Sequence, residues 1–267
     1  MKEINSTGEL KQIGLEILLS VHQFCEDHHI MYSLACGTLI GAVRHQGFIP
    51  WDDDVDIYML RNDYNRFLDI YHDETGHYQA ISLETSKDWK QPYAKVFDTH
   101  TLLIEQSNTN VDGVGFGIDV FPIDAAPDSL ADWQKYEKRR VLLQRLFGMK
   151  KMVWREGRSL AKNIFLYMMK FFLLPFSMRS MAKMIDRYAK KYNDMSTSYL
   201  AESCFGNPNN RFAHADFSTS VDIYFQGHQL KAMNGFENYL RAFYGDYMKL
   251  PPKEQRITHH AFKVFWT

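Results

Sequence analysis

The acidic run Pro50-Trp51-Asp52-Asp53-Asp54-Val55-Asp56-Ile57 is the feature that most constrains what this chain can fold into. Crowded carboxylates within an apolar frame cost free energy unless a cation lies among them. In a strand that begins at Val55, the two-residue period places Asp54 and Asp56 on one face and the apolar residues on the other. The sequence therefore predicts a half-buried strand that presents two parallel carboxylates to a divalent cation.

The chain has 267 residues, of which 45% are hydrophobic, so it can bury the core of one large domain or of a core with a smaller lobe. Its first residues show no basic segment followed by an apolar stretch and a cleavage site. Cys25, Cys36 and Cys204 are far apart and form no Cys-x-x-Cys pair, which argues against disulfides and against a thiolate zinc site. We therefore expect a cytoplasmic protein with reduced thiols.

The overall net charge of -1 conceals a strong segregation of charge. The segment from Lys138 to Lys183 holds twelve Lys or Arg against the single acid Glu156, a local net of +11, so the remainder carries -12. This asymmetry indicates an anionic partner for the middle of the chain, and its sign alone allows a membrane surface, a phosphate polymer or nucleic acid.

Hydrophobic periodicity divides the chain into three segments. Residues 1–129 mix a helix at 8–28 with strand-like runs near 78–83, 92–97, 101–106 and 114–121. Residues 130–196 lack strand alternation and are predicted to be helical and basic, and residues 197–267 form a mixed segment that completes the core. We predict an α+β protein with a mixed β-sheet flanked by helices and a helical basic insertion.

The apolar stretch from Ile164 to Phe176 is shorter than the roughly 20 residues that a spanning helix needs, and Lys170 and Pro175 interrupt it. A transmembrane span is therefore not expected. Two alternatives stay open: the stretch lies in a lipid interface, with the protein peripheral at the inner face of the cell membrane, or it packs on the core.

Gly37 and Thr38 precede a predicted helix, where free backbone N–H groups, the helix dipole and a hydroxyl suit a phosphate group. The pattern Gly-Thr followed by Asp54-Val55-Asp56-Ile57 resembles the signature of the nucleotidyltransferase (polymerase-beta-like) fold. The longer run from Gly37 to Ile57 resembles the signature of the LicD family, phosphocholine transferases of bacterial surface glycopolymers. Further similar segments are Ala94-Lys95-Val96, Ile118 to Asp124, Tyr239-Leu240 and Tyr244 through Pro251-Pro252 to His259.

This resemblance implies transfer of phosphocholine from CDP-choline to a sugar hydroxyl of a lipid-linked glycan, such as a teichoic acid precursor, with release of CMP and a need for Mg²⁺ or Mn²⁺. Such a reaction needs alignment of the hydroxyl with the phosphorus and neutralisation of phosphate charge, which divalent cations supply. The implied metal ligands and catalytic residues are Asp54, Asp56 and Asp119, with Asp119 also a candidate general base.

The remaining candidates concern the substrate. Arg44 and Lys95 are candidates for diphosphate contact, and the late His259 is a candidate phosphate contact with an equal claim to a packing role. The quaternary ammonium of choline is best held by aromatic faces, for which Trp51, Trp89 and Tyr93 are candidates near the motifs.

The same residues allow other interpretations. A related enzyme would move ribitol phosphate, glycerol phosphate or a nucleoside monophosphate, and a non-enzyme would be a membrane-recruited binding subunit. The intact acids argue against a binding subunit. Asp52 and Asp53 are expected to support the site from the loop rather than to bind metal. No aromatic-interleaved motif accompanies the basic segment, so nucleic acid is not an expected partner.

Overall fold

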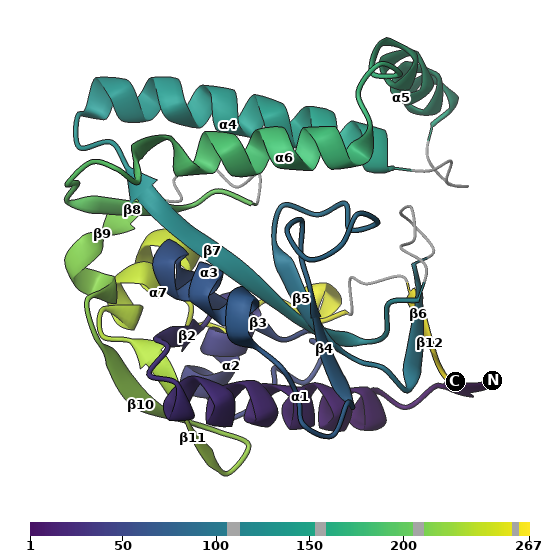
Figure 1. The fold of residues 1–267 in the computed structure, drawn as a ribbon, viewed down its shortest axis with the longest axis vertical. Coiled ribbons are helices and arrows are strands. Elements are labelled where there is room, and N and C mark those ends of the chain that lie inside the picture. The colour runs from purple at the N-terminus through teal and green to yellow at the C-terminus, as the bar shows by residue number, and fades with distance from the viewer. Residues whose placement is uncertain (106–112, 153–158, 205–210, 258–261) are drawn as a thin grey trace.

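The computed structural model of the protein describes residues 1–105, 113–152, 159–204, 211–257 and 262–267 (Figure 1). The helices in these residues are α1 (Thr7–Asp27), α2 (Cys36–His45), α3 (Arg61–Ile70), α4 (Leu130–Lys151), α5 (Leu160–Phe172), α6 (Met178–Ala189) and α7 (Phe236–Tyr244). The strands are β1 (Lys2–Ile4), β2 (Tyr32–Leu34), β3 (Asp56–Leu60), β4 (Tyr78–Ile81), β5 (Ala94–Asp98), β6 (Thr101–Glu105), β7 (Gly117–Ala126), β8 (Tyr199–Glu202), β9 (Arg211–Ala213), β10 (Ser220–Phe225), β11 (His228–Met233) and β12 (Phe262–Trp266). The mixed α and β class predicted from the sequence is confirmed.

The central sheet has the strand order β2-β3-β7-β5-β4, and β8 and β9 continue from the far end of β7. Its β3 and β7 pair in parallel, whereas its other neighbours pair antiparallel. The strand β7 is longer than the sequence pattern indicates, because its first half pairs with β3 and β5 and its second half pairs with β8. The mixed sheet therefore depends on β7 as its shared central strand.

The first three helices and the sheet bury one hydrophobic core. Ser6 caps α1 by accepting a hydrogen bond from the Glu9 backbone N–H, and Ile17, Leu18 and Val21 are completely buried on one side of that helix. The predicted helix at 8–28 and its serine cap are thus present. Burial of apolar side chains at three- and four-residue spacing explains why this segment is helical and lies along the sheet.

Two smaller sheets complete the body. The strand β12 lies between β1 and β6, so the N- and C-terminal strands are neighbours in space (Figure 1). The strands β10 and β11 form a separate hairpin. Strands of the last segment therefore lie beside strands from the first half of the chain.

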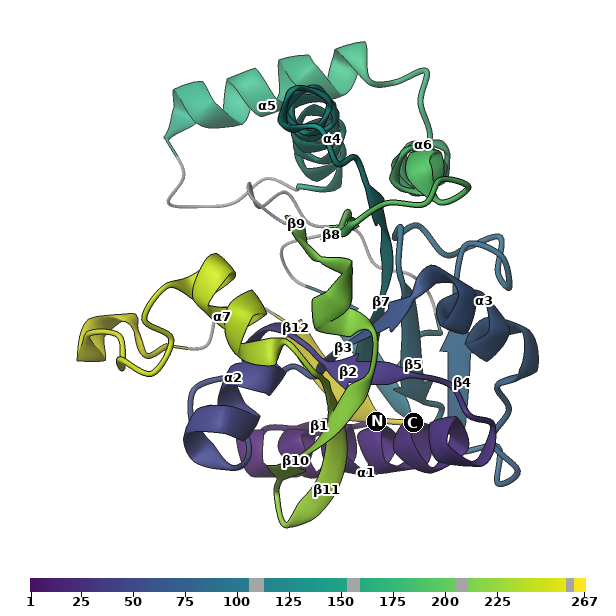
Figure 2. The same cartoon turned by 90° about the vertical axis from the view of Figure 1, so that its left-hand side faces the viewer.

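The helices α4, α5 and α6 form a layer at one end of the molecule, opposite α1 (Figure 2). A second apolar cluster joins this layer to the body, with Trp89, Phe97 and Val114 from the body packed among Phe147 and Met181 of the layer. None of the helices in the described part of the chain is long and apolar enough to cross a membrane.

A buried ion-pair network also attaches the helical layer to the sheet. Arg61, the first residue of α3, donates two hydrogen bonds to the Asp124 carboxylate of β7 at 2.6 and 2.7 Å. Its Nη1 atom lies 3.0 Å from Asp186 of α6, and Asn193 donates to Asp124 at 2.6 Å. The side chains of Arg61 and Asp124 are 8% and 0% exposed, so neither charge is solvated well by water.

Replacement of Arg61 by Met should lower the free energy of unfolding by about 3–5 kcal/mol, because it leaves the buried Asp124 without its cationic partner. Urea denaturation followed by circular dichroism measures this loss. The control is Arg66→Met on the exposed side of the same helix, which should change stability by less than about 0.5 kcal/mol. Equal effects of the two substitutions would contradict the assigned role of Arg61.

Candidate active site

Three charged side chains lie in one row across the centre of the sheet. Asp56, the first residue of β3, is the register partner of Asp119 on β7, and Asp119 is also the register partner of Lys95 on β5. Residues directly opposite each other on neighbouring strands project from the same face of a sheet. The row therefore presents two carboxylates and one ammonium group together.

The loop before β3 is held to the start of α2. The Thr38 hydroxyl oxygen accepts a hydrogen bond of 2.9 Å from the Asp56 backbone N–H, and Thr38 is only 3% exposed. A Cβ atom at Gly37 would overlap the Asp52 carboxylate, so a larger residue there would require the Asp52 side chain to move. The structure thus gives Gly37 and Thr38 a defined part in positioning the acidic loop, whereas phosphate contact by these residues stays a prediction.

The same loop is also held to β7. The Asp119 backbone N–H donates a hydrogen bond of 2.9 Å to the Val55 carbonyl oxygen. Val55 is buried at 2% exposure, while Asp54 before it lines a cleft. Val55 lines this cleft as well, whereas Asp56 is not among its described lining residues, so the shared face predicted for Asp54 and Asp56 stays a prediction. The strand itself begins at Asp56 rather than at Val55.

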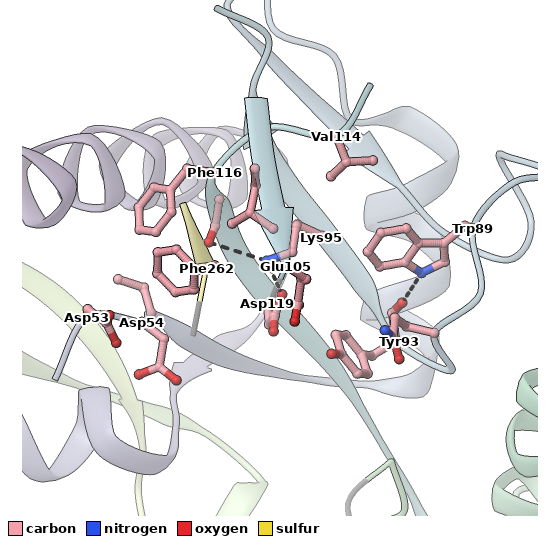
Figure 3. A pocket seen from close by; sticks show the side chains of 14 residues that line it. Asp53, Asp54, Trp89, Tyr93, Lys95, Glu105, Val114, Phe116, Asp119 and Phe262 are labelled. Atoms are coloured by element: carbon pink, nitrogen blue, oxygen red, sulfur yellow. Dashed lines mark hydrogen bonds and ion pairs between the residues drawn. The ribbon is translucent and has the colours of Figure 1, made fainter. Parts of the chain in front are cut away.

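Lys95 is the counter-ion of Asp119 in this structure, with 2.5 Å between Lys95 Nζ and Asp119 Oδ1 (Figure 3). Burial raises the pKa of Asp119, an effect that the Lys95 charge opposes. Burial also raises the pKa of Asp56 well above its usual range, and the negative charges of Asp54, Asp119 and Asp52 raise it further. The carboxylates are thus crowded enough to favour a cation among them.

The described residues contain no group of three His, Cys, Asp or Glu side chains arranged as a ready metal site. The chemistry of the acids nevertheless suits a hard divalent cation, because Asp54, Asp56 and Asp119 offer carboxylate oxygens and their mutual repulsion is expressed in the raised pKa of Asp56. Their role as ligands of such an ion stays a prediction, and in the structure the Lys95 ammonium is the charge paired with Asp119.

A cleft of about 790 Å³, part of it open to solvent, lies beside this row (Figure 3). The residues that line it are Asp53, Asp54, Val55, Trp89, Gln91, Tyr93, Lys95, Leu103, Glu105, Val114, Phe116, Gly117, Asp119 and Phe262. Figure 3 shows Phe116 and Phe262 beside Asp53 and Asp54 at one end and Trp89 at the other, so aromatic rings lie at both ends of the cleft.

The three aromatic residues predicted to hold choline differ in their position relative to the cleft. Trp89 and Tyr93 both line the cleft, and the Trp89 indole N–H donates a hydrogen bond of 2.6 Å to the Tyr93 carbonyl oxygen. Trp51 is not among the described residues of the cleft. Its ring instead lies 6.3 Å from that of His45 and 5.5 Å from the Arg256 guanidinium. The structure therefore brings two of the three aromatic candidates to the acids.

Arg44 also lies outside the described lining of the cleft. Its Nη1 atom donates to the Tyr247 carbonyl oxygen at 2.8 Å, and its Nε atom donates to His45 at 3.0 Å. Burial lowers the pKa of Arg44, and the nearby positive charge of Arg256 lowers it further. Arg44 thus links α2 to the C-terminal segment, and contact with a diphosphate remains a prediction for it. His259 lies outside the described residues.

Two charged residues of this region could not be singled out from the sequence. Glu105 at the end of β6 lines the cleft. Lys151 at the end of α4 is buried enough to lower its pKa, while the negative charges of Glu105 and Asp119 raise it. The basic composition of residues 138–183 was visible in the sequence, but only the course of α4 shows which of its cations reaches Asp119.

The late tyrosine motif has a structural explanation. The Tyr239 hydroxyl of α7 lies 3.1 Å from the Tyr58 hydroxyl of β3, and Tyr58 in turn lies 3.3 Å from the Cys36 sulfur. Burial raises the pKa of the Cys36 thiol well above its usual range, which disfavours its thiolate form. This cluster fixes α7 against the strand that carries Asp56.

Comparisons with known proteins show the family to which the chain belongs. Residues 29–153, which carry the row of charges, match the family described as LicD/FKTN/FKRP, nucleotidyltransferase domain. The chain is 34% identical to the lipopolysaccharide cholinephosphotransferase LicD of Haemophilus influenzae, over 96% of this chain and 97% of that protein. The chain therefore belongs to the LicD family. It is also 41% and 44% identical to uncharacterized proteins of Rickettsia typhi and Rickettsia prowazekii, over 24% of this chain and 21% and 24% of theirs.

The raised pKa of Asp56 predicts how the free energy of unfolding depends on pH. A carboxyl group whose folded pKa is raised favours folding when protonated, and this contribution is lost as the pH rises through the folded pKa. Asp56→Asn should therefore raise the free energy of unfolding at about pH 8 in the presence of EDTA, and this gain should shrink as the pH falls toward about pH 4.

Urea denaturation at several pH values measures the effect. The matched control is Asp69→Asn on the exposed side of α3, for which no comparable pH-dependent gain is expected. A variant Asp56→Asn that is no more stable than the wild type at the higher pH would show that the acids are not in electrostatic conflict.

Proposed function

We propose that this protein transfers phosphocholine from CDP-choline to a sugar hydroxyl of a lipid-linked surface-glycan precursor and releases CMP. The observation that carries the proposal is the row of Asp56, Asp119 and Lys95 beside an aromatic cleft, in a chain of the LicD family. The H. influenzae relative is named as a lipopolysaccharide cholinephosphotransferase and is similar over nearly the whole chain. The chain is accordingly a phosphotransferase.

In this reaction the acceptor oxygen attacks the phosphorus that bears choline. A new P–O bond forms, the P–O bond to CMP breaks, and the acceptor proton passes to a base. Asp119 is the candidate base because its buried carboxyl group has a raised pKa, which increases its proton affinity. Lys95, already 2.5 Å from Asp119, supplies positive charge where the phosphate oxygens would lie.

A divalent cation, Mg²⁺ or Mn²⁺, would neutralise phosphate charge and align the reacting groups when bound. Asp54, Asp56 and Asp119 are its proposed ligands. Thr38 contributes indirectly to this set. Its hydroxyl oxygen accepts a hydrogen bond from the Asp56 backbone N–H and so fixes the position of Asp56 at the start of β3.

The aromatic part of the cleft is proposed to hold the choline group. A quaternary ammonium ion has no N–H to donate and is attracted to the faces of aromatic rings. Tyr93 and Trp89 line the cleft together with Phe116 and Phe262, so the described cleft offers several rings near the acids. Tyr93 also packs on Phe121 with 4.5 Å between ring centroids, which limits the movement of its ring.

Loss of Asp54 or of Asp56, two of the three proposed metal ligands, should abolish transfer of phosphocholine. Asp54→Ala and Asp56→Ala should each reduce release of CMP from CDP-choline, in the presence of acceptor and Mg²⁺, by at least about 100-fold. Chromatographic measurement of CMP tests this, and Asp69→Ala is the matched control with unchanged activity. Circular dichroism verifies that each variant is folded. Full activity in both variants would end the proposal.

Recognition of choline should depend on the ring of Tyr93. A ligand that binds only the native state raises the melting temperature, so CDP-choline should stabilise the protein more than CDP-glycerol, CDP-ribitol or nucleoside triphosphates do. Tyr93→Leu should weaken binding of CDP-choline by about tenfold and leave binding of CMP unchanged, whereas Tyr93→Phe should retain both.

Thermal shift and isothermal titration calorimetry measure these differences. Stronger stabilisation by CDP-ribitol or CDP-glycerol would identify a related phosphotransferase with a different transferred group. Equal losses for CDP-choline and CMP in Tyr93→Leu would show that the ring does not contact choline.

A further inference from the structure

The helix α5 carries its apolar side chains on the side that faces away from the protein. Asn163 is the buried residue of this helix. Six large apolar residues at helical spacing are 49–69% exposed, and we call them the outer face of α5: Leu160, Ile164, Phe165, Met168, Phe171 and Phe172. A helix that packs on a protein core normally has the opposite orientation, with its apolar side inward. Exposure of six such residues together is therefore unusual for the surface of a soluble domain.

The surroundings of this face are basic. Lys162 is exposed on α5, and Lys170 lies near enough to Lys150 for the positive charge of Lys150 to lower its pKa, in addition to the effect of burial. The Lys150 ammonium donates a hydrogen bond of 2.6 Å to the Leu173 carbonyl oxygen at the end of α5. Residues 138–183 as a whole carry a net charge of +11, so the outer face of α5 belongs to the most basic part of the chain.

The same layer of helices also contains an apolar hollow. It has a volume of about 370 Å³ and is lined by Leu143, Leu146, Leu173, Phe176, Met181 and Met184 from α4, α6 and the connection between α5 and α6. No polar surface lines it within the described residues. The hollow and the outer face of α5 thus both belong to the layer of helices at the end of the molecule opposite α1 (Figure 2).

The helical layer is also connected to the cleft. Leu173 and Met181 belong to the same apolar cluster as Trp89 and Val114, and the latter two line the cleft. At the end of α4, Lys151 lies within electrostatic reach of Asp119. One layer of helices therefore carries the exposed apolar face on its outside and contacts the candidate active site on its inside.

We propose that the outer face of α5 docks the protein on a membrane that contains anionic lipids, with Phe171 and Phe172 inserted among the acyl chains and the neighbouring lysines at the headgroups. Apolar insertion and attraction to anionic headgroups together account for both the apolar and the basic character of this surface. This inference rests on the proposed function in one respect, because docking there would place the cleft near a lipid-linked acceptor.

Sedimentation with vesicles tests the docking independently of catalysis. The full chain should bind vesicles of phosphatidylglycerol and phosphatidylcholine more tightly than vesicles of phosphatidylcholine alone. The double variant Phe171→Ser/Phe172→Ser should bind the anionic vesicles at least about tenfold more weakly. The control Val221→Ser/Tyr224→Ser removes exposed apolar residues from the β10–β11 hairpin and should bind like the wild type.

A charge variant provides the second test, because Lys162→Glu changes only an exposed side chain. It should weaken binding to anionic vesicles and leave the melting temperature unchanged. Sedimentation equilibrium without lipid tests the other occupant of this face, a second copy of the chain. A dimer that dissociates when Phe171 and Phe172 are replaced would overturn the proposal, as would wild-type binding by that double variant or failure of the wild type to bind.

Activity separates this inference from the proposed function. The double variant should release CMP from CDP-choline normally with a water-soluble acceptor and lose activity only with an acceptor embedded in anionic vesicles. Vesicle binding without any release of CMP by the wild type would refute the proposed function and leave the docking intact. Equal activity of wild type and double variant on the embedded acceptor would refute the docking.

Discussion

The parallel pairing of β3 with β7 is the constraint on which the rest of the structure depends. It sets Asp56 directly opposite Asp119 and so forces two acids together on one face of the sheet. Burial raises the pKa of both carboxyl groups, and the negative charge of Asp119 raises that of Asp56 further. Lys95 offsets part of this rise from β5, and the antiparallel register of β5 with β7 is what brings its ammonium group to Asp119.

Other contacts of β7 resist the repulsion that this arrangement creates. At its far end, Asp124 is neutralised by Arg61, which also holds α6. At its near end, the Asp119 backbone N–H binds the Val55 carbonyl oxygen and draws the acidic loop to the sheet. The strand β7 thus carries a stable ion pair at one end and mutually repelling carboxylates at the other. This is expected where function requires groups that do not favour folding.

Much of the fold and the centre of the site could be predicted from local patterns. The periodicity of α1 and the alternation around Asp54 and Asp56 depend on neighbouring residues, and the match of Ile118 to Asp124 to a known motif identified Asp119. The positions of Arg44 and Trp51 relative to the cleft could not be predicted, because proximity in the sequence to the acidic run does not determine the direction of a loop. Lys151 and Glu105 were missed because their approach to Asp119 depends on long-range packing of α4 and β6. The segment boundaries at 129 and 196 stay predictions.

The pairing of β12 with β6 has a consequence for biosynthesis. Phe262 of β12 and Leu103 of β6 form part of the same wall of the cleft, although ribosomes make them at very different times. Before β12 has been made, this wall of the cleft is incomplete. Ligand binding in the cleft should therefore begin only after translation has passed β12.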